Sequence, residues 1–365
     1  MTVPPLPADD GALAAPTTDA LGRPFPTPEH RSRYAAKLAW EAHGIDPFGQ
    51  RFAADAQAGI VVAEFDHWAG KTVHLAGRVT AKRGQGKAAF LDLRDRSGKI
   101  QLYATVDVLG EESLDRLVRL IHMGDFLGVT GEVFRTNRGE VSIRVQEYTL
   151  LSKALSPLPE KWHGLTDVET RFRQRYLDLI SNPEVKDLFL KRSKAIKTVR
   201  DFLDERGYVE IETPMLTDVA SGAAARPFNT HHNALDWDLL LRISLELPLK
   251  KAMIGGIDRV FEIGRVFRNE GIDRDHSPEF TMLECYEAFG DYTVMMDITE
   301  QIFFRVSNAI NGSPVVTLAN GKTVDMTPPW PRKTYSELLH EATGLVLTPE
   351  TTLDEVKALI AKHHL

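Results

Sequence analysis

Hydrophobic and polar residues alternate between about residues 71 and 150, in five short runs separated by Gly-containing turns. Such alternation is typical of strands with one buried face. The inward positions are Val73, Leu75, Gly77 and Val79; Ala89, Leu91 and Leu93; Ile100, Leu102 and Ala104; Leu127, Val129, Gly131 and Val133; and Val141, Ile143 and Val145. A helical stretch over about 110–122 follows the third run. This order predicts a small closed barrel of the OB type.

Outside the barrel the pattern has mainly a helical period. Thr27-Pro28-Glu29 reads as a helix start, with a hydroxyl N-cap and Pro at the first position. The elements predicted further along are a helix over 184–206 ended by Gly207, a strand over 208–212, two strands over 259–268 and 280–288, a helix over 292–310, a hairpin at Asn320-Gly321 and two short helices.

Length and composition indicate a soluble protein of about two domains. The chain has 365 residues, 43% hydrophobic and 26% charged, with a net charge of −7 that argues against binding by bulk positive charge. One cysteine excludes a disulfide scaffold, and the start of the chain has no secretory pattern, so we expect a cytoplasmic location without membrane contact. The predicted divisions are a disordered tail (1–26), a helical segment (27–65), the barrel (66–152), a Pro-punctuated linker (153–170) and a second domain (171–365).

The outward face of the barrel carries aromatic side chains among polar ones. Its members are Arg78, Phe90, Asp92, Arg94, Gln101, Tyr103, Glu140, Ser142 and Arg144. Such a face stacks bases on its aromatics and contacts their edges with amides and acids. Lys82, Arg83 and Lys87 are placed in the first hairpin loop, where phosphates would be in reach. The alternative is that these aromatics cover a neighbouring domain.

The paired strands of the second domain gather a polar set. Arg268 and Glu270 share one face of the first strand, and Phe280, Met282, Glu284 and Tyr286 share one face of the second. With antiparallel pairing these faces coincide. Either this is a polar site, or it is a solvated hairpin with cross-strand ion pairs. Cys285 faces the other way and is predicted to be a core residue. His231 and His232 are predicted to be structural.

Several segments resemble motifs of class II aminoacyl-tRNA synthetases. Gly264–Gly271 and His276–Glu284 resemble motif 2, and Gly207–Pro214 resembles motif 1, which belongs to the dimer interface in that class. The closer similarity is to the lysyl-tRNA synthetases. It is carried by Ala81–Gly84, Asn137–Glu140, Arg173–Asp178, Gly222–Phe228 and Thr230–Asp236.

The resemblance implies an α+β fold, in which an N-terminal OB barrel precedes a class II antiparallel-sheet catalytic domain that is incomplete at its C-terminus. It implies lysine–tRNA ligation with lysine, ATP, Mg²⁺ and tRNA(Lys), in a homodimer formed through motif 1. Arg268 is then the catalytic residue. The implied binding sets are Arg268, Glu270, Arg274, His276 and Phe280 for ATP; Gly222, Glu246, Arg268, Glu284 and Tyr286 for lysine; and Arg78, Phe90, Gln101 and Glu140 for the anticodon.

The sequence departs from the family after residue 310, where no Gly-rich motif 3 follows. The acids that hold Mg²⁺ in the family are expected beyond residue 365, so no metal ligand is assigned here, and these 365 residues alone are expected not to form lysyl-adenylate. Pro248 stands where the family has an aromatic residue, a change compatible only with an early helical turn. The alternatives are a non-catalytic tRNA-binding or dimerisation relative and, more distantly, a synthetase of the aspartate/asparagine branch.

Overall fold

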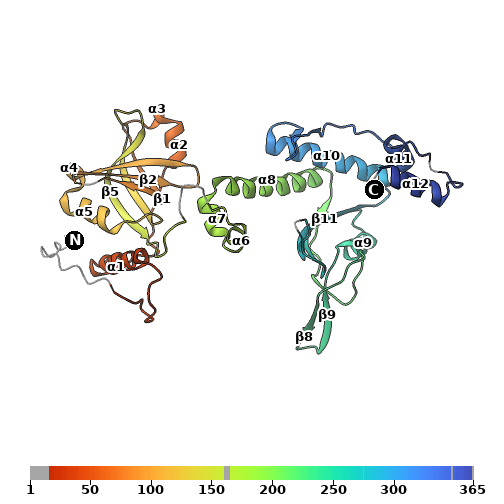
Figure 1. Ribbon diagram of the computed structural model, residues 1–365, viewed down its shortest axis with the longest axis horizontal. Helices are drawn as coiled ribbons and strands as arrows, with labels where there is room; N and C mark the ends of the chain where they lie inside the picture. The colour runs from red at the N-terminus through yellow and green to blue at the C-terminus, as the bar shows by residue number, and fades with distance from the viewer. Residues whose placement is uncertain (1–15, 85, 160–164, 274, 347, 364–365) are drawn as a thin grey trace. The chain divides into compact units, whose positions relative to one another are not determined.

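The computed structural model describes residues 16–84, 86–159, 165–273, 275–346 and 348–363 (Figure 1). The chain divides into two compact units that meet in the sequence at Asn182 and Pro183. Residues 1–15 of the predicted disordered tail lie outside the described part, and a bridge between Thr18 and Pro24 closes a turn in the remainder of that segment.

The first unit contains a closed five-stranded barrel, as predicted from the alternation (Figure 1). Its strands, in the order in which they pair around the barrel, are β1 (Thr72–Arg83), β2 (Ala88–Arg94), β3 (Lys99–Thr105), β5 (Val141–Ser152) and β4 (Phe126–Arg135). Every pairing is antiparallel except that of β3 with β5. The predicted inward side chains form one buried core.

Seven described helices accompany the barrel in the first unit. They are α1 (Pro28–Ala42), α2 (Ala58–Ala63), α3 (Phe65–Trp68), α4 (Val106–Leu109), α5 (Glu111–Leu120), α6 (Val168–Arg173) and α7 (Arg175–Ser181). Thr27 caps α1 by accepting a hydrogen bond from His30 N, as the sequence predicted. The helix expected over about 110–122 is α5, and the short helix α4 that precedes it was not predicted; Gly110 between them has a φ of 78°, which separates the two helices. Both α6 and α7 group with the first unit, so the boundary expected at residue 171 differs from the break at Asn182.

A buried carboxylate holds the segment after β5 against the barrel. Asp125 is fully buried, and its Oδ2 lies 2.6 Å from Nζ of the equally buried Lys153. The Asp125 side chain also accepts from His122 N and Ala154 N, so each oxygen of the buried charge is satisfied. Lys153 Nζ lies 2.8 Å from Nδ1 of His122, whose ring is thereby assigned as the acceptor.

Two further cations point at backbone carbonyls near this cluster. Lys82 Nζ donates to the oxygens of Val118 and Ile121, at the C-terminal end of α5, where a helix carries partial negative charge. Arg33, 1% exposed, donates from α1 to the oxygen of Met123. The expectation that Lys82 meets phosphates from a loop is therefore wrong, because Lys82 lies in β1 and its ammonium is used inside the unit.

The second unit is built on small sheets and two long helices. Its elements are α8 (Pro183–Glu205), β6 (Val209–Glu210), β7 (Leu216–Thr217), β8 (Asn229–His232), β9 (Trp237–Leu241), α9 (Glu246–Ile254), β10 (Arg259–Phe267), β11 (Glu279–Glu287), α10 (Tyr292–Asn311), β12 (Val315–Thr317), β13 (Thr323–Asp325), α11 (Tyr335–Thr343) and α12 (Leu353–His363). The sheet orders are β11-β10-β6, β7-β9-β8 and β12-β13. The predicted helices α8 and α10, the strands β10 and β11, the β12–β13 hairpin and two short helices are present, and β6 is shorter than the predicted strand over 208–212. No ranges were predicted for β7, β8, β9 and α9.

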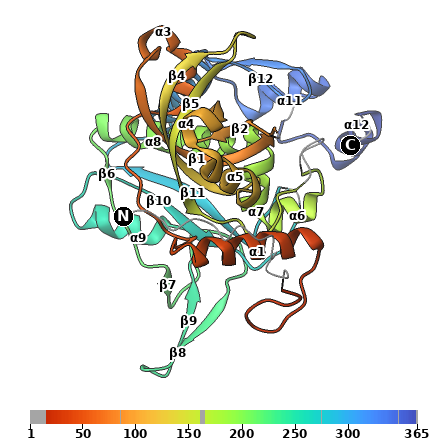
Figure 2. The same ribbon diagram turned by 90° about the vertical axis from the view of Figure 1, so that its left-hand side faces the viewer.

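The two faces of the β10–β11 pair pack against different hydrophobic residues. The helix α9 lies beside this sheet (Figure 2). On one face, Phe261 and Cys285 pack with Phe202 of α8 and Ile298 of α10. Cys285 is therefore the core residue that was predicted, and burial raises the pKa of its thiol to about 11. The other face packs against α9, and it carries the polar residues of the candidate site.

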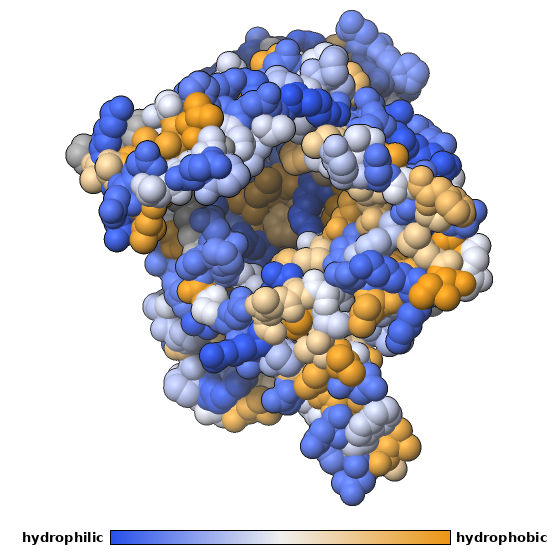
Figure 3. Space-filling model, turned by 90° about the vertical axis from the view of Figure 1, so that its right-hand side faces the viewer, coloured by the Kyte–Doolittle hydropathy of each residue, from blue (hydrophilic) through white to orange (hydrophobic). Residues whose placement is uncertain are grey.

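The β8–β9 hairpin projects from the second unit, and apolar side chains gather on it (Figure 3). Leu235 and Trp237 are both exposed there. His231, on the same hairpin, lies 2.8 Å from a carboxylate oxygen of Asp238, which agrees with a structural role. No helix in the described part of the chain is both long and apolar enough to cross a membrane.

The group formed by His122, Asp125 and Lys153 makes the stability of the first unit depend on pH. Burial and the nearby Lys153 ammonium lower the pKa of His122 from 6.5 to about 4. The unfolded chain therefore takes up this proton before the folded chain does, and the free energy of unfolding falls as the pH drops from about 6.5 to about 4. We expect His122→Gln to remove much of this slope in urea unfolding of the first unit, whereas the same change at the exposed His67 should leave it. An undiminished slope in His122→Gln would contradict the assignment.

Candidate functional site

Two carboxylates converge on the α9 face of the β10–β11 sheet. Glu284 lies on β11, where its Oε1 accepts from Leu245 N at 3.0 Å and its Oε2 accepts from the Tyr286 hydroxyl at 2.8 Å. Because Leu245 is the N-cap of α9, the Glu284 carboxylate holds the start of that helix, where negative charge is favoured. Glu246 is the next residue along, so α9 presents a second acid beside the first. Burial, followed by donation to Glu284, raises the pKa of Tyr286.

Gly222 approaches this pair of acids from a loop. Its φ of 78° favours glycine, and a Cβ there would lie 2.0 Å from Ser244 Oγ and 2.9 Å from Glu246 Cβ. The Ser244 hydroxyl fixes the same loop by donating to the oxygen of Ser221 at 2.7 Å. Gly222, Glu246, Glu284 and Tyr286 are thus brought together as the sequence analysis expected. Pro248 falls in the first turn of α9, where proline is tolerated.

Arg268 lies just beyond the end of β10. The strand ends at Phe267, and Arg268 N then donates to the oxygen of Pro278. The Arg268 guanidinium carbon is 5.2 Å from the centroid of the Phe280 ring, and its Nε donates to the oxygen of Ile243 at 3.4 Å. The structure therefore joins Arg268 and Phe280, two of the residues expected to contact ATP.

The loop after β10 corrects one expectation. Glu270 does not share a strand face with Arg268, because the backbone leaves the ladder at Phe267 and Glu270 is an exposed loop residue. His276 is also exposed, and its Nδ1 lies 2.7 Å from Oδ2 of Asp273. Hydrogen bonds from Asp275 N and from His276 lower the pKa of the Asp273 carboxyl. Arg274, expected near the outer phosphates, lies outside the described residues.

A buried ion pair supports the site and was missed by the sequence analysis. Arg242 and Glu262 are about 4% exposed, with Nη1 of the arginine 2.7 Å from Oε1 of the glutamate. Glu262 also accepts from the hydroxyl of Thr213 at 2.6 Å. Since Glu262 is directly opposite Glu284 in the β10–β11 register, continuing the alternation along β10 would have found it. Nothing in the local sequence identifies Arg242 as its partner.

Removal of one member of this pair leaves the other charge buried and unpaired. We expect Arg242→Met to lower the free energy of unfolding of the second unit by about 3–5 kcal/mol. The double variant Arg242→Met, Glu262→Met should recover part of this loss, because it removes both buried charges. Urea unfolding measures both, and the transition of the first unit serves as the internal control. If the double variant loses as much free energy of unfolding as the two single variants Arg242→Met and Glu262→Met lose together, the two charges are not coupled.

Three aromatic rings form a row on the outside of the barrel. Phe90 of β2 and Tyr103 of β3 stack with centroids 4.9 Å apart and planes 29° apart, and Phe134 of β4 lies 5.9 Å from Tyr103. The Arg144 guanidinium carbon is 4.8 Å from the centroid of Phe134. The sequence analysis identified Phe90 and Tyr103 but not Phe134, although its place after the inward Val133 is the same signal.

The other barrel residues predicted to bind the anticodon differ in their contacts. Gln101 accepts from the Ser142 hydroxyl at 3.0 Å, and the same hydroxyl lies 3.4 Å from the backbone oxygen of Glu140, whose side chain is exposed. Arg78 contacts two other residues. Its Nη1 donates to the oxygen of Gly124, and its guanidinium carbon lies 4.2 Å from the centroid of Phe126, a residue paired with it across β1 and β4.

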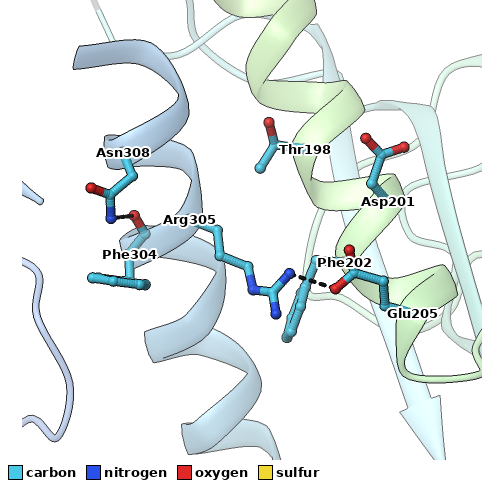
Figure 4. A pocket seen from close by; sticks show the side chains of 7 residues that line it. All are labelled: Thr198, Asp201, Phe202, Glu205, Phe304, Arg305 and Asn308. Atoms are coloured by element: carbon cyan, nitrogen blue, oxygen red, sulfur yellow. Dashed lines mark hydrogen bonds and ion pairs between the residues drawn. The ribbon is translucent and has the colours of Figure 1, made fainter. Parts of the chain in front are cut away.

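A pocket of the second unit lies between α8 and α10 (Figure 4). It has a volume of about 470 Å³, and Glu205 and Arg305 form an ion pair of 2.6 Å across it. None of the predicted site residues lines it. Within the described ranges, no group of three or more His, Cys, Asp or Glu residues is arranged to hold a metal ion.

Comparison with known families places both units. Residues 167–359 match the family model described as tRNA synthetases class II (D, K and N), a match that begins before the residue 171 expected from the sequence. Residues 73–151 match the model described as an OB-fold nucleic acid binding domain. The α+β fold class and its order of domains are thereby confirmed.

Individual relatives are similar over most of this chain. The lysine–tRNA ligase of Thermoanaerobacter pseudethanolicus is 51% identical over 320 residues, which cover 87% of this chain and 64% of the relative. That of Syntrophomonas wolfei is 53% identical over 302 residues, covering 83% and 61%. That of Oceanobacillus iheyensis is 43% identical over 343 residues, covering 92% and 69%. The chain therefore spans between 61% and 69% of the length of these relatives.

Proposed function

The chain belongs to the class II tRNA synthetases (D, K and N), and from this premise we propose that it serves the ligation of lysine to tRNA(Lys). The observation that carries this proposal is the convergence of Glu246 and Glu284 beside Tyr286 and Gly222. Lysine brings two ammonium groups, which need carboxylates as partners when they leave water. An aspartate substrate would instead need a free cation, and Arg242 of this unit is already paired with Glu262.

In the proposed reaction, the lysine carboxylate attacks the α-phosphorus of ATP and pyrophosphate leaves, so that lysyl-adenylate forms. A terminal ribose hydroxyl of the tRNA then attacks the carbonyl carbon, and AMP leaves. Arg268 is assigned to the α-phosphate and the lysine carboxylate, because a fixed cation offsets the negative charge that the phosphoryl oxygens gain. Phe280, beside Arg268, is assigned to the adenine ring, with Glu270 at its edge and His276 toward the outer phosphates.

The proposed chemistry needs no nucleophile from the protein. The thiol of Cys285 lies in the packed core with a raised pKa, which agrees with this. Mg²⁺, when bound, would offset charge on the ATP phosphates. The described residues do not form a set that fits it, so we assign none of them to the ion and route no step through it.

The barrel is assigned to the anticodon. The ring row of Phe90 and Tyr103 supports this, because aromatic side chains bind bases through their faces. Gln101 and Glu140 are assigned to the base edges. Arg78 is assigned to the anticodon as well, and its contacts with Gly124 and Phe126 hold its guanidinium in place. The second candidate function is tRNA binding without catalysis, which is favoured by the self-contained core of the barrel.

We also propose that the protein works in the cytoplasm as a homodimer formed through α8 and β6. Leu188 and Leu190 of α8 and Val209 of β6 are between 49% and 65% exposed, and exposed apolar side chains are typical of surfaces that a partner covers.

Loss of one pocket carboxylate tests the proposed lysine site. We expect Glu284→Gln to weaken lysine binding by more than about tenfold, or ~1.4 kcal/mol, because an ammonium loses its counter-charge. Isothermal titration of L-lysine into the full chain measures the effect. Glu279→Gln is the matched control, because Glu279 is an exposed acid at the start of the same strand. Equal affinities for wild type and Glu284→Gln would remove Glu284 from the site.

Loss of the outer aromatic ring tests the proposed anticodon site. We expect Phe90→Ala to cost roughly 1–3 kcal/mol of affinity for an anticodon stem-loop, the range for one stacked base. Phe48→Ala, at an exposed residue of the same unit, is the control. Binding of the stem-loop can be followed by fluorescence anisotropy. A variant that weakens whole tRNA but not the stem-loop would place the contact of Phe90 outside the anticodon.

A further inference from the structure

An ammonium group of the chain itself already occupies the proposed lysine pocket. Nζ of Lys250 lies 2.5 Å from Oε1 of Glu246 and 5.7 Å from the centroid of the Tyr286 ring. Glu246 and Tyr286 are two of the groups assigned above to the substrate, and Tyr286 donates in turn to Glu284. The chain therefore supplies the same chemical group, a primary ammonium on an aliphatic stem, that the substrate side chain would bring.

The helix α9 determines this arrangement. Glu246 lies in its first turn and Lys250 one turn later, a spacing that puts both side chains on one side of the helix. Leu249, between them, is fully buried against the sheet and fixes how the helix is rotated. The Lys250 side chain is 49% exposed and that of Glu246 is 30% exposed, so water competes with the pair. Exposed pairs of this spacing contribute little to stability, and this contact is easily broken.

We propose that Lys250 is an internal competitor of the substrate, which holds Glu246 and the face of Tyr286 until the ammonium of free lysine displaces it. This inference rests on the proposed function. Displacement costs the protein one weak ion pair, and the released Lys250 ammonium returns to solvent, which it already contacts. The result is a lower affinity for lysine than the two carboxylates alone would give, while Glu246 is never left without a cation.

The simpler alternative is an ordinary surface ion pair that orients Glu246 for the substrate. The two explanations predict opposite signs. Removal of a competitor strengthens lysine binding, whereas removal of an orienting partner weakens it. Lys251 provides a matched control, because it is the neighbouring exposed lysine of the same helix.

The first test is isothermal titration of L-lysine into the full chain. Lys250→Met keeps most of the aliphatic stem but removes the charge, and we expect it to tighten lysine binding about two- to fivefold, the size of an exposed ion pair. Lys250→Arg and Lys251→Met should both stay near wild type. Unchanged or weaker binding by Lys250→Met would overturn the inference. If the wild-type chain binds no lysine at all, the proposed lysine site fails and this inference fails with it.

The second test follows Lys250 directly. Limited acetylation of the full chain, read by mass spectrometry, gives the labelling of Lys250 relative to Lys251 in the same sample. We expect this labelling ratio to be below one in wild type and to rise in Glu246→Gln. It should also rise in wild type when L-lysine is added. Norleucine should leave the ratio unchanged, because it lacks the side-chain ammonium. A ratio that does not respond to L-lysine, in a chain that titration shows to bind it, would overturn displacement while leaving the lysine site intact.

Discussion

The buried pair of Arg242 and Glu262 is the interaction on which the candidate site of the second unit depends. Arg242 follows β9, Glu262 lies in β10, and both bond to Thr213 from the segment after β6. Three segments distant in sequence are therefore joined at one point. The contact is so close that a Cβ on Gly264 would lie 2.4 Å from Arg242 Nη2 and 2.7 Å from Glu262 Oε1. The backbone of Arg242 also accepts from Phe267 N, so the same residue fixes the point at which β10 ends and Arg268 begins.

This ion pair helps to position both Arg268 and the start of α9. Toward Arg268, the end of the strand directs the guanidinium to Phe280. Toward α9, the few residues after Arg242 lead to Leu245, whose N–H is held by Glu284. The Glu284 carboxylate, which we propose to bind lysine, thus also holds the start of a helix, so it cannot move freely. This preorganisation is what a binding pocket for a charged side chain requires, because charges that must reorganise on binding lose much of their interaction energy.

Periodicity predicted the parts of the molecule in which one face of a strand is buried. The barrel core and the shared face of Phe280, Met282, Glu284 and Tyr286 followed from alternation alone, because a buried face constrains every second residue. The roles of Lys82 and Arg242 could not be predicted in this way, since their partners are backbone oxygens or residues far along the chain. The departure of Glu270 from the strand was also hidden, because Asn269 N donates to the oxygen of Arg226, a distant residue that the local sequence does not reveal. The identity of the site came from the combination of motifs, and its geometry came from the structure.

The strand order of the barrel has a consequence for how the chain folds during synthesis. β5 is the last of the five barrel strands in sequence. It pairs with both β3 and β4, so the barrel is closed only when β5 lies between them. The barrel therefore cannot close until residues up to about 152 have left the ribosome, and the cation that Asp125 needs arrives with the next residue, Lys153. Until then the apolar faces of four strands stay without their final partner, a state that attracts chaperones and other nascent chains.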